Sequence, residues 1–475
     1  MQPLDDFADA VAVAEAVRRR DVSPVEVVAA TLERISRLDG EVNSIVVVLA
    51  EQALAEARRA ETAAAAGEEV GPLHGVPFSV KDVLWLRDAP ATNGSRALHD
   101  FTPAVDAVAV ARLREAGAIP VGKTNNPELC FAGVTDNRVY GLTRNPRDLS
   151  RTPGGSSGGA GASLALGLTP LALGTDGGGS VRIPSSFCGV AGLKPSYGLV
   201  PGTPGFRGWR SLSVVGPMAR TTRDLALVLS VLAGFHPSDD TTVELPLGEY
   251  ARAVAEANGD DLRVAVSADL GFAPLEPGVR QAFETAIGRL GGAGWKLEEA
   301  HPPTGDPVDL WNLVAACEGY AAHRDLLEHH REELEPGTVD ALSAGERYSA
   351  ADYLDATEER AGFVRSWLEF LDRYDVLLTP TMQLTAFPVG SASPATIGDH
   401  RVDPERDDWC VFCYPANLAG LPAASVPCGL DERGLPVGLQ IVGGRFRDET
   451  VLRTAAAFEA LQPWPRGAPD PPSEV

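Results

Sequence analysis

The chain lacks the residues that several classes of protein require in number. Six cysteines in 475 residues are too few for a disulfide framework. Lysine and arginine number 41 against 65 aspartates and glutamates, and the formal net charge of −24 repels nucleic acid and anionic membranes. No run of about 18 residues is apolar throughout, and Asp5, Asp6 and Asp9 precede any apolar stretch, which predicts neither a membrane span nor a secretory signal. We therefore expect a cytoplasmic protein with neither a nucleic-acid nor a membrane partner.

Metal-binding patterns are scarce as well. Cys410 and Cys413 have the spacing of half a zinc site or of a redox pair, yet no second Cys or His pair with suitable spacing accompanies them. Their role is left open by the sequence. The other four cysteines lie in apolar contexts and are interpreted as buried thiols: Cys130, Cys188, Cys317 and Cys428. The sequence thus predicts no metal ion and no cofactor.

Histidine, the usual general base, is rare, with eight residues in the chain. Nearly all of them lie in segments that we interpret as surface loops or charged helices. None has the surroundings of an obvious catalytic base: His74, His99, His236, His301, His323, His329, His330 and His400. A catalytic hydroxyl in this chain would therefore need a different proton acceptor.

Glycine, by contrast, is abundant, and two glycine-dense turns contain serine. Residues 152–159 read Thr-Pro-Gly-Gly-Ser-Ser-Gly-Gly, and residues 174–182 read Gly-Thr-Asp-Gly-Gly-Gly-Ser-Val-Arg. Glycine lets neighbouring N–H groups point together, so a serine in such a turn can lie beside an oxyanion hole. Ser156 and Ser180 are 24 residues apart, which leaves room for one helix between the two turns. A flexible linker would account for one such cluster more readily than for both.

Lysine can replace histidine as a base when burial makes it neutral. Lys81 follows the apolar run at residues 76–80, which predicts a buried strand. A lysine in that position, taken alone, is usually a charge that extends to water. Together with the two serine turns, Lys81 indicates a relay of one lysine and two serines.

At these residues the chain resembles the amidase signature family of serine amidohydrolases. The glycine-rich block continues through residues 181–195, which follow the family signature closely, and shorter matches flank it at residues 74–82, 122–125, 417–422 and 434–440. The resemblance spans roughly residues 5–462 and is loose from about 240 to 375. It implies a single large α/β domain over residues 1–465, with a mixed, mostly parallel sheet of about eleven strands covered by helices on both faces. Residues 466–475, rich in proline, are expected to form a flexible tail.

The resemblance also implies a role for each residue of the site. Ser180 is the expected nucleophile, Ser156 the proton bridge on a cis peptide bond, and Lys81 the general base. The expected reaction forms an acyl-enzyme on Ser180 and releases ammonia or an amine. The expected oxyanion hole consists of the backbone N–H groups of Gly177, Gly178, Gly179 and Ser180. Asp176 and Arg182, which flank this turn with opposite charges, are expected to hold its shape.

Two functions remain open within this resemblance. One is an amidase that hydrolyses a small carboxylic acid amide, and the other is the glutaminase (A) subunit of a tRNA-dependent amidotransferase. Residues 211–217 read Ser-Leu-Ser-Val-Val-Gly-Pro, which is closer to the stand-alone hydrolases than to the Leu-Asp-Gln pattern of the glutaminase subunits. We therefore favour the amidase, with a small-molecule amide as its partner. A homodimer is compatible with the resemblance, and a catalytically inactive binding protein is disfavoured because Lys81, Ser156 and Ser180 are all present.

One further motif suggests nucleotide binding but has the wrong context. Residues 117–124 fit the Gly-x-x-x-x-Gly-Lys-Thr pattern of a phosphate-binding loop. Such a loop needs a strand before its first glycine and a helix after its lysine. Here residues 107–116 have helical periodicity and residues 119–121 predict a strand inside the supposed loop, so Gly117 is interpreted as the end of a helix.

The remaining pattern is typical of alternating helices and strands. Helices are expected at residues 5–19, 50–66 and 449–461, and the Ser23-Pro24-Val25-Glu26 capping box predicts another helix that ends near Leu38. Strands are expected at residues 45–48, 77–80, 171–173, 262–266, 375–378, 424–427 and 437–442. Five aromatic residues could line an acyl pocket or belong to the ordinary core: Phe131, Trp209, Trp311, Phe412 and Tyr414.

Overall fold

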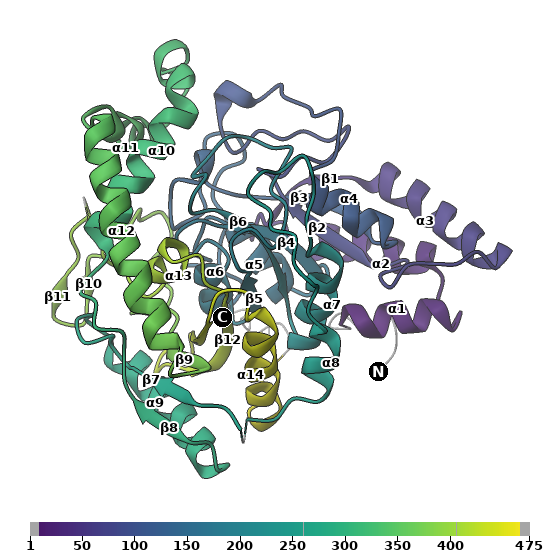
Figure 1. The fold of residues 1–475 in the computed structure, drawn as a ribbon. Coiled ribbons are helices and arrows are strands. Elements are labelled where there is room, and N and C mark those ends of the chain that lie inside the picture. Colours follow the sequence, from purple (N-terminus) through teal and green to yellow (C-terminus); the bar gives the residue numbers. More distant parts are fainter. Residues whose placement is uncertain (1–8, 260, 405, 466–475) are drawn as a thin grey trace, which may run out of the picture.

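The computed structural model describes residues 9–259, 261–404 and 406–465. The expected tail at residues 466–475 lies outside them. An eleven-stranded sheet forms the centre of the molecule, with helices on both sides (Figure 1). Its strands, in spatial order, are β1 (Ile45–Val48), β3 (Ile119–Thr124), β2 (Pro77–Lys81), β4 (Leu171–Asp176), β6 (Val214–Ala219), β5 (Ala191–Lys194), β12 (Ala423–Leu430), β13 (Pro436–Gly443), β9 (Val376–Pro380), β7 (Val264–Val266) and β8 (Leu297–Glu299). A separate ribbon pairs β10 (Thr396–Ile397) with β11 (His400–Arg401).

The sheet is mixed, as expected. Parallel pairing predominates only near its two ends, where β2 pairs with β3 and β4 and where β7 pairs with β8 and β9. The strands between these groups, and β1 at the edge, pair antiparallel. One reason is local, since β12 and β13 are joined by a short turn at residues 431–435, and such a connection permits only an antiparallel pair.

Fourteen helices surround the sheet in the described part of the chain. They are α1 (Ala10–Arg18), α2 (Pro24–Leu38), α3 (Ala50–Ala66), α4 (Val108–Glu115), α5 (Gly158–Ala165), α6 (Arg182–Cys188), α7 (Thr222–Leu232), α8 (Tyr250–Ala255), α9 (Pro277–Gly292), α10 (Val308–His329), α11 (Pro336–Glu346), α12 (Ala350–Leu371), α13 (Tyr414–Leu418) and α14 (Asp448–Leu461). None of the described helices is both long enough and apolar enough to cross a membrane.

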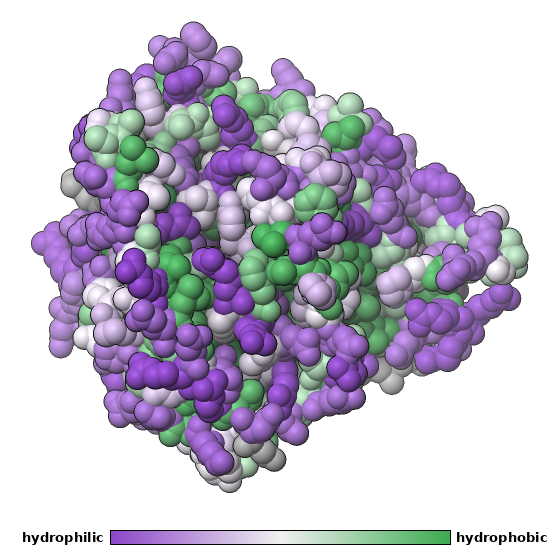
Figure 2. Space-filling view, in the orientation of Figure 1, coloured by the Kyte–Doolittle hydropathy of each residue, from purple (hydrophilic) through white to green (hydrophobic). Residues whose placement is uncertain are grey.

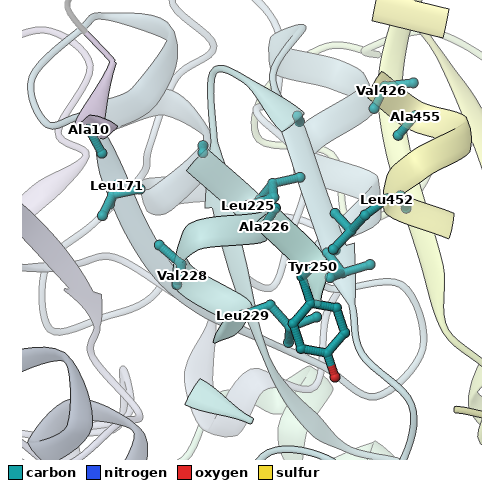
Figure 3. Packing of buried hydrophobic residues seen from close by; sticks show 14 of the residues in the cluster. Ala10, Leu171, Leu225, Ala226, Val228, Leu229, Tyr250, Val426, Leu452 and Ala455 are labelled. Atoms are coloured by element: carbon teal, nitrogen blue, oxygen red, sulfur yellow. The ribbon is translucent and has the colours of Figure 1, made fainter. Parts of the chain in front are cut away.

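Both faces of the sheet are covered because successive side chains of a strand point to opposite sides. In β4, Leu171 and Leu173 pack into the largest core cluster, whereas Ala172 packs into a separate cluster with residues of α5. Figure 3 shows the first face, where side chains of α7 and α14 such as Leu225 and Leu452 come together. The outer surface in the view of Figure 2 is largely hydrophilic, with apolar patches toward its centre.

Local signals in the sequence place the ends of several helices. The capping box at Ser23 is formed, because its hydroxyl accepts from Glu26 N and the Glu26 carboxylate accepts from Ser23 N. The first helix begins at Ala10 rather than at residue 5, since the Asp9 side chain caps it by accepting from Ala12 N. Residues 5–8 of the expected helix lie outside the described residues.

The segment that imitates a phosphate-binding loop is a helix end followed by a strand. α4 ends at Glu115, Gly117 adopts the left-handed conformation with φ of 90°, and β3 begins at Ile119. The Lys123 ammonium is fully buried and donates to the carbonyl oxygens of Asp82, Leu84 and Pro90. This arrangement agrees with the interpretation of Gly117 as a helix terminus.

Candidate active site

Lys81 is the last residue of β2 and is fully buried. Its Nζ lies 2.7 Å from Ser156 Oγ and 2.8 Å from Thr175 Oγ1. Burial in the sheet lowers the pKa of Lys81 below its ordinary value of 10.5, because the ammonium form loses its hydration. The amine can therefore be neutral at a lower pH than an exposed lysine.

Lys81 differs from the other buried lysines in the type of its partners. The chain contains four lysines, of which Lys81, Lys123 and Lys194 are fully buried. Lys194 Nζ donates to the carbonyl oxygens of Pro195 and Leu421, and Lys123 also donates only to carbonyl oxygens. A carbonyl oxygen accepts hydrogen bonds but has no proton to give, whereas a hydroxyl can do both. Among these three amines, only Lys81 is positioned to receive a proton.

The two serine turns lie side by side. The backbone N–H of Ser157 donates to the carbonyl oxygen of Ser180 at 3.1 Å. The peptide bond between Gly155 and Ser156 is cis, as expected. Glycine is required at residue 155, because a Cβ there would lie 2.3 Å from the carbonyl oxygen of Val134. Both Ser156 and Ser180 line one cavity of about 480 Å³, which is large enough for a small organic substrate.

The N–H groups of the nucleophile turn are not equivalent. Gly179 N, which was expected to belong to the oxyanion hole, already donates to Asp176 Oδ1 at 2.9 Å. Within the described residues, the N–H groups of Gly177, Gly178 and Ser180 donate no hydrogen bond. These three groups are available for a developing negative charge. Gly178 must remain glycine, because a Cβ would lie 2.6 Å from Trp311 Cζ2.

Asp176 and Arg182 form a buried ion pair at the base of this turn. Arg182 Nη2 lies 2.8 Å from Asp176 Oδ1, and Arg182 Nε lies 2.9 Å from Asp176 Oδ2. Burial alone would raise the pKa of Asp176, but the Arg182 guanidinium outweighs that effect and holds it well below the usual range. The remaining N–H groups of Arg182 donate to Cys413 O, Gln440 Oε1 and Asn417 Oδ1. All five donors of the guanidinium are thus satisfied.

This ion pair predicts a large stability effect. Arg182→Met leaves the buried Asp176 carboxylate without a counterion, and we expect the free energy of unfolding to fall by about 3–5 kcal/mol. Arg280→Met is the matched control, because Arg280 is 42% exposed and its pair with Asp269 at 3.6 Å should contribute less than about 1 kcal/mol. Urea unfolding followed by circular dichroism measures both values. Equal losses in the two variants would contradict the structural role of the buried pair.

The aromatic candidates divide into two groups. Phe131 and Trp209 line the cavity and meet edge to face at 5.1 Å between ring centroids. Trp311, Phe412 and Tyr414 are buried behind it, and Trp311 Nε1 donates to the carbonyl oxygen of Gly177. In the described part of the chain, no histidine lines the cavity.

Sequence reasoning missed two residues that contact the base. Thr175 is the neighbour of Lys81 on the adjacent strand, and the only signal for it would have been the parallel pairing of β2 with β4. Cys130 was expected to be a buried thiol, but it is half-buried and lines the cavity, because residues 128–130 form a short 3₁₀ turn at the cavity wall. Cys317 is also half-buried, whereas Cys188 and Cys428 are buried as expected, and Cys410 and Cys413 are buried as well.

Comparisons with known proteins agree with this fold. The Amidase family model matches residues 26–452. The chain is 38% identical to an acylamidase of Rhodococcus erythropolis over 96% of each protein. It is also 38% identical to the A subunit of the glutamyl-tRNA(Gln) amidotransferase of Moorella thermoacetica, over 96% of this chain and 97% of that protein. The crystal structure of a bacterial aryl acylamidase of the amidase signature family superimposes with a TM-score of 0.90 at 31% identity, covering 96% of this chain and 97% of that one. The chain therefore belongs to the amidase signature family and is an amidohydrolase that acts on C–N bonds.

Proposed function

We propose that the protein hydrolyses a small, uncharged carboxylic acid amide through an acyl-enzyme on Ser180. The observation that supports this proposal most directly is the 2.7 Å contact between Lys81 Nζ and Ser156 Oγ, deep in the wall of the cavity that Ser180 also lines. Burial favours the neutral amine, and its partner is a hydroxyl that can pass on a proton. They supply the base and the bridging hydroxyl of a lysine-based relay.

In the proposed first step, Lys81 accepts the proton of Ser156 while Ser156 accepts the proton of Ser180. Ser180 Oγ attacks the amide carbonyl, and the resulting oxyanion is stabilised by N–H groups of the glycine turn. When the tetrahedral intermediate collapses, the C–N bond breaks and the relay returns the proton to the leaving nitrogen. Water then attacks the acyl-enzyme with the same relay as base, which releases the carboxylic acid and restores Ser180.

We assign the oxyanion hole to the N–H groups of Gly177, Gly178 and Ser180. Gly179 instead shapes the turn, because its N–H is held by Asp176. The fixed geometry supports this assignment, since Asp176 also accepts from Val181 N and is anchored by Arg182. Donors held in place before the reaction stabilise a developing charge without having to reorganise.

The apolar rings and the paired charges around the cavity favour an uncharged substrate over glutamine, and among the charged lining residues that the structure describes Arg207 alone has no ion-pair or hydrogen-bond partner. Arg210 is paired with Asp240 at the cavity rim. Asp239 accepts from Gly202 N and from Thr241, while Glu318 accepts from Ser211 N and Tyr353 Oη. Glutamine would need a partner for its carboxylate and another for its ammonium group. The apolar rings of Phe131 and Trp209 supply neither. The glutaminase role remains the alternative, because the amidotransferase relative is as similar in sequence as the acylamidase.

The test uses the purified chain by itself, with no partner protein added. We expect it to release 4-nitroaniline from 4-nitroacetanilide and ammonia from simple aliphatic or aryl amides, and to release little ammonia from glutamine. Absorbance at the aniline band and a coupled ammonia assay measure the two products. Ser180→Ala, prepared in the same way, controls for contaminating amidases. Turnover of glutamine alone would contradict the proposal and favour the glutaminase.

A further inference from the structure

The Cys130 thiol lies among the groups of the proposed relay, although the relay as described does not use it. It is half-buried at the end of the 3₁₀ turn η2 (Glu128–Cys130) and lines the cavity together with Ser156, Thr175 and Ser180. Its side chain interacts with both Lys81 and Ser156. A group that contacts the base and the bridging hydroxyl at once can influence how they are oriented.

The hydrogen bonds around the Cys130 thiol determine whether it acts as a donor or as an acceptor toward Lys81. Cys130 Sγ donates to Asn93 Oδ1 at 3.4 Å, so the single thiol hydrogen is used there. The sulfur lone pairs are left for an N–H bond of Lys81, because the single hydroxyl hydrogen of Ser156 is needed for the amine lone pair. Cys130 is therefore an acceptor toward the relay.

The number of partners around Lys81 explains how an acceptor there can orient the amine. A neutral amine has two N–H bonds and one lone pair, and Lys81 has three neighbours: Ser156, Thr175 and Cys130. If Thr175 Oγ1 and Cys130 Sγ accept the two N–H bonds, the lone pair is directed at Ser156. That is the orientation in which the amine can take a proton from the bridging serine.

The backbone around Cys130 fixes the thiol in this place. Leu129 and Cys130 both adopt the left-handed conformation, with φ of 50° and 63°, which non-glycine residues adopt at a cost. Leu129 N donates to Asn93 O, and Cys130 N donates to Pro127 O. The buried Glu128 carboxylate accepts from Ser95 Oγ and Glu335 N, which anchors the turn. The strained turn is thus held by contacts on several sides.

We propose that Cys130 is a positioning residue that accepts a hydrogen bond from Lys81 and so directs the amine lone pair at Ser156. This inference rests on the proposed function. Other charged groups face the same region: Asp176 follows Thr175 at the end of β4, and Asp82 follows Lys81 and lies 3.8 Å from Lys123 Nζ. None of these groups is altered by a substitution at residue 130.

The experiment compares three variants through their pH profiles of kcat and kcat/KM with 4-nitroacetanilide. Cys130→Ala removes the acceptor, Cys130→Ser keeps one, and Cys317→Ala removes the other half-buried thiol, which does not line the cavity. For Cys130→Ala we expect kcat to fall by about three- to tenfold with little change in KM. A hydrogen-bond acceptor favours the ammonium form of Lys81 and so raises its pKa. Without Cys130, the acid limb of the pH profile, in which activity rises with pH, should therefore move to lower pH by about half a unit or more. Cys130→Ser and Cys317→Ala should stay close to the wild type in both respects.

The outcomes separate this inference from the proposed function. If Cys130→Ala folds, as judged by its circular dichroism, and keeps both the wild-type kcat and the wild-type acid limb, the positioning role is wrong. An equal loss in Cys130→Ser and Cys130→Ala with no movement of the acid limb would also overturn it, since that pattern reports packing alone. If Cys130→Ala does not fold, Cys130→Ser still decides, because a kcat more than about tenfold below the wild type contradicts the role of an acceptor. Retained turnover in Ser180→Ala would instead refute the proposed function itself.

Discussion

Ser180→Ala is expected to lower kcat by about 10⁴-fold or more, because the variant has no oxygen to form the acyl-enzyme. The substitution removes a single atom from a side chain that is 8% exposed, and the neighbouring turn is held by Asp176 and Arg182 rather than by the hydroxyl. The fold should therefore be unaffected. Initial rates with 4-nitroacetanilide and thermal unfolding midpoints measure the two effects separately.

Covalent labelling identifies the nucleophile independently of turnover. A fluorophosphonate probe should modify the wild type at the peptide that contains Ser180, and the Ser180→Ala variant should not be labelled. Ser230→Ala is the matched control, since this serine lies on α7 and its hydroxyl donates to Ala226 O. Label on Ser156 itself, or undiminished turnover in Ser180→Ala, would refute the proposed assignment of the two serines.

The parts of the site that could be predicted from sequence are those set by local composition. The apolar run before Lys81 predicted a buried strand, and β2 is buried throughout. The two glycine-dense turns were recognisable because glycine is needed wherever another backbone or ring approaches closely, as Val134 does at Gly155. The strands and helices that periodicity predicted are present with end positions shifted by a few residues, whereas others, such as β5, β6, β8, α7 and α9, were not predicted.

The parts that could not be predicted depend on residues distant in the chain. Arg182 reaches Asn417 and Gln440, which follow it by 235 and 258 residues, so no local pattern reveals these contacts. The hydrogen bond from Gly179 N to Asp176 depends on a side-chain orientation that composition does not specify. The aromatic residues look alike in sequence, and only tertiary packing places Trp209 in the cavity wall and Trp311 behind it.

Because the chain contains only four lysines, the second large prediction has a well-matched control. Lys296 is the one lysine among four that is exposed, and it lies between α9 and β8, away from the cavity lining. Lys81→Met and Lys296→Met therefore remove the same group from two environments. We expect Lys81→Met to lose about 10²–10⁴-fold in kcat/KM near neutral pH, since the proposed relay loses its base. Lys296→Met should match the wild type.

The pH dependence of activity follows from the direction of the Lys81 pKa. The relay needs the neutral amine, so wild-type kcat/KM should rise with pH through the lowered pKa of Lys81 and then level off. Lys81→Met should lack this acid limb. A flat wild-type profile from acid to alkaline pH, or an acid limb that persists in Lys81→Met, would contradict the assignment of Lys81 as the base.

Replacing Lys81 should also change how the free energy of unfolding depends on pH. Between the lowered pKa of Lys81 in the folded state and its ordinary value of 10.5, the unfolded chain binds a proton that the folded chain does not. The contribution of Lys81 to the free energy of unfolding therefore increases with pH across that window. At the lower end of this window the wild type carries the cost of deprotonating a buried lysine, and Lys81→Met does not. We expect the free energy of unfolding of Lys81→Met, minus that of the wild type, to be highest at the lower end of this window and to decline as the pH approaches 10.5. Urea unfolding at several pH values measures this trend. If Lys81→Met loses activity while it gains stability relative to the wild type, Lys81 serves the chemistry of the site rather than the stability of the fold.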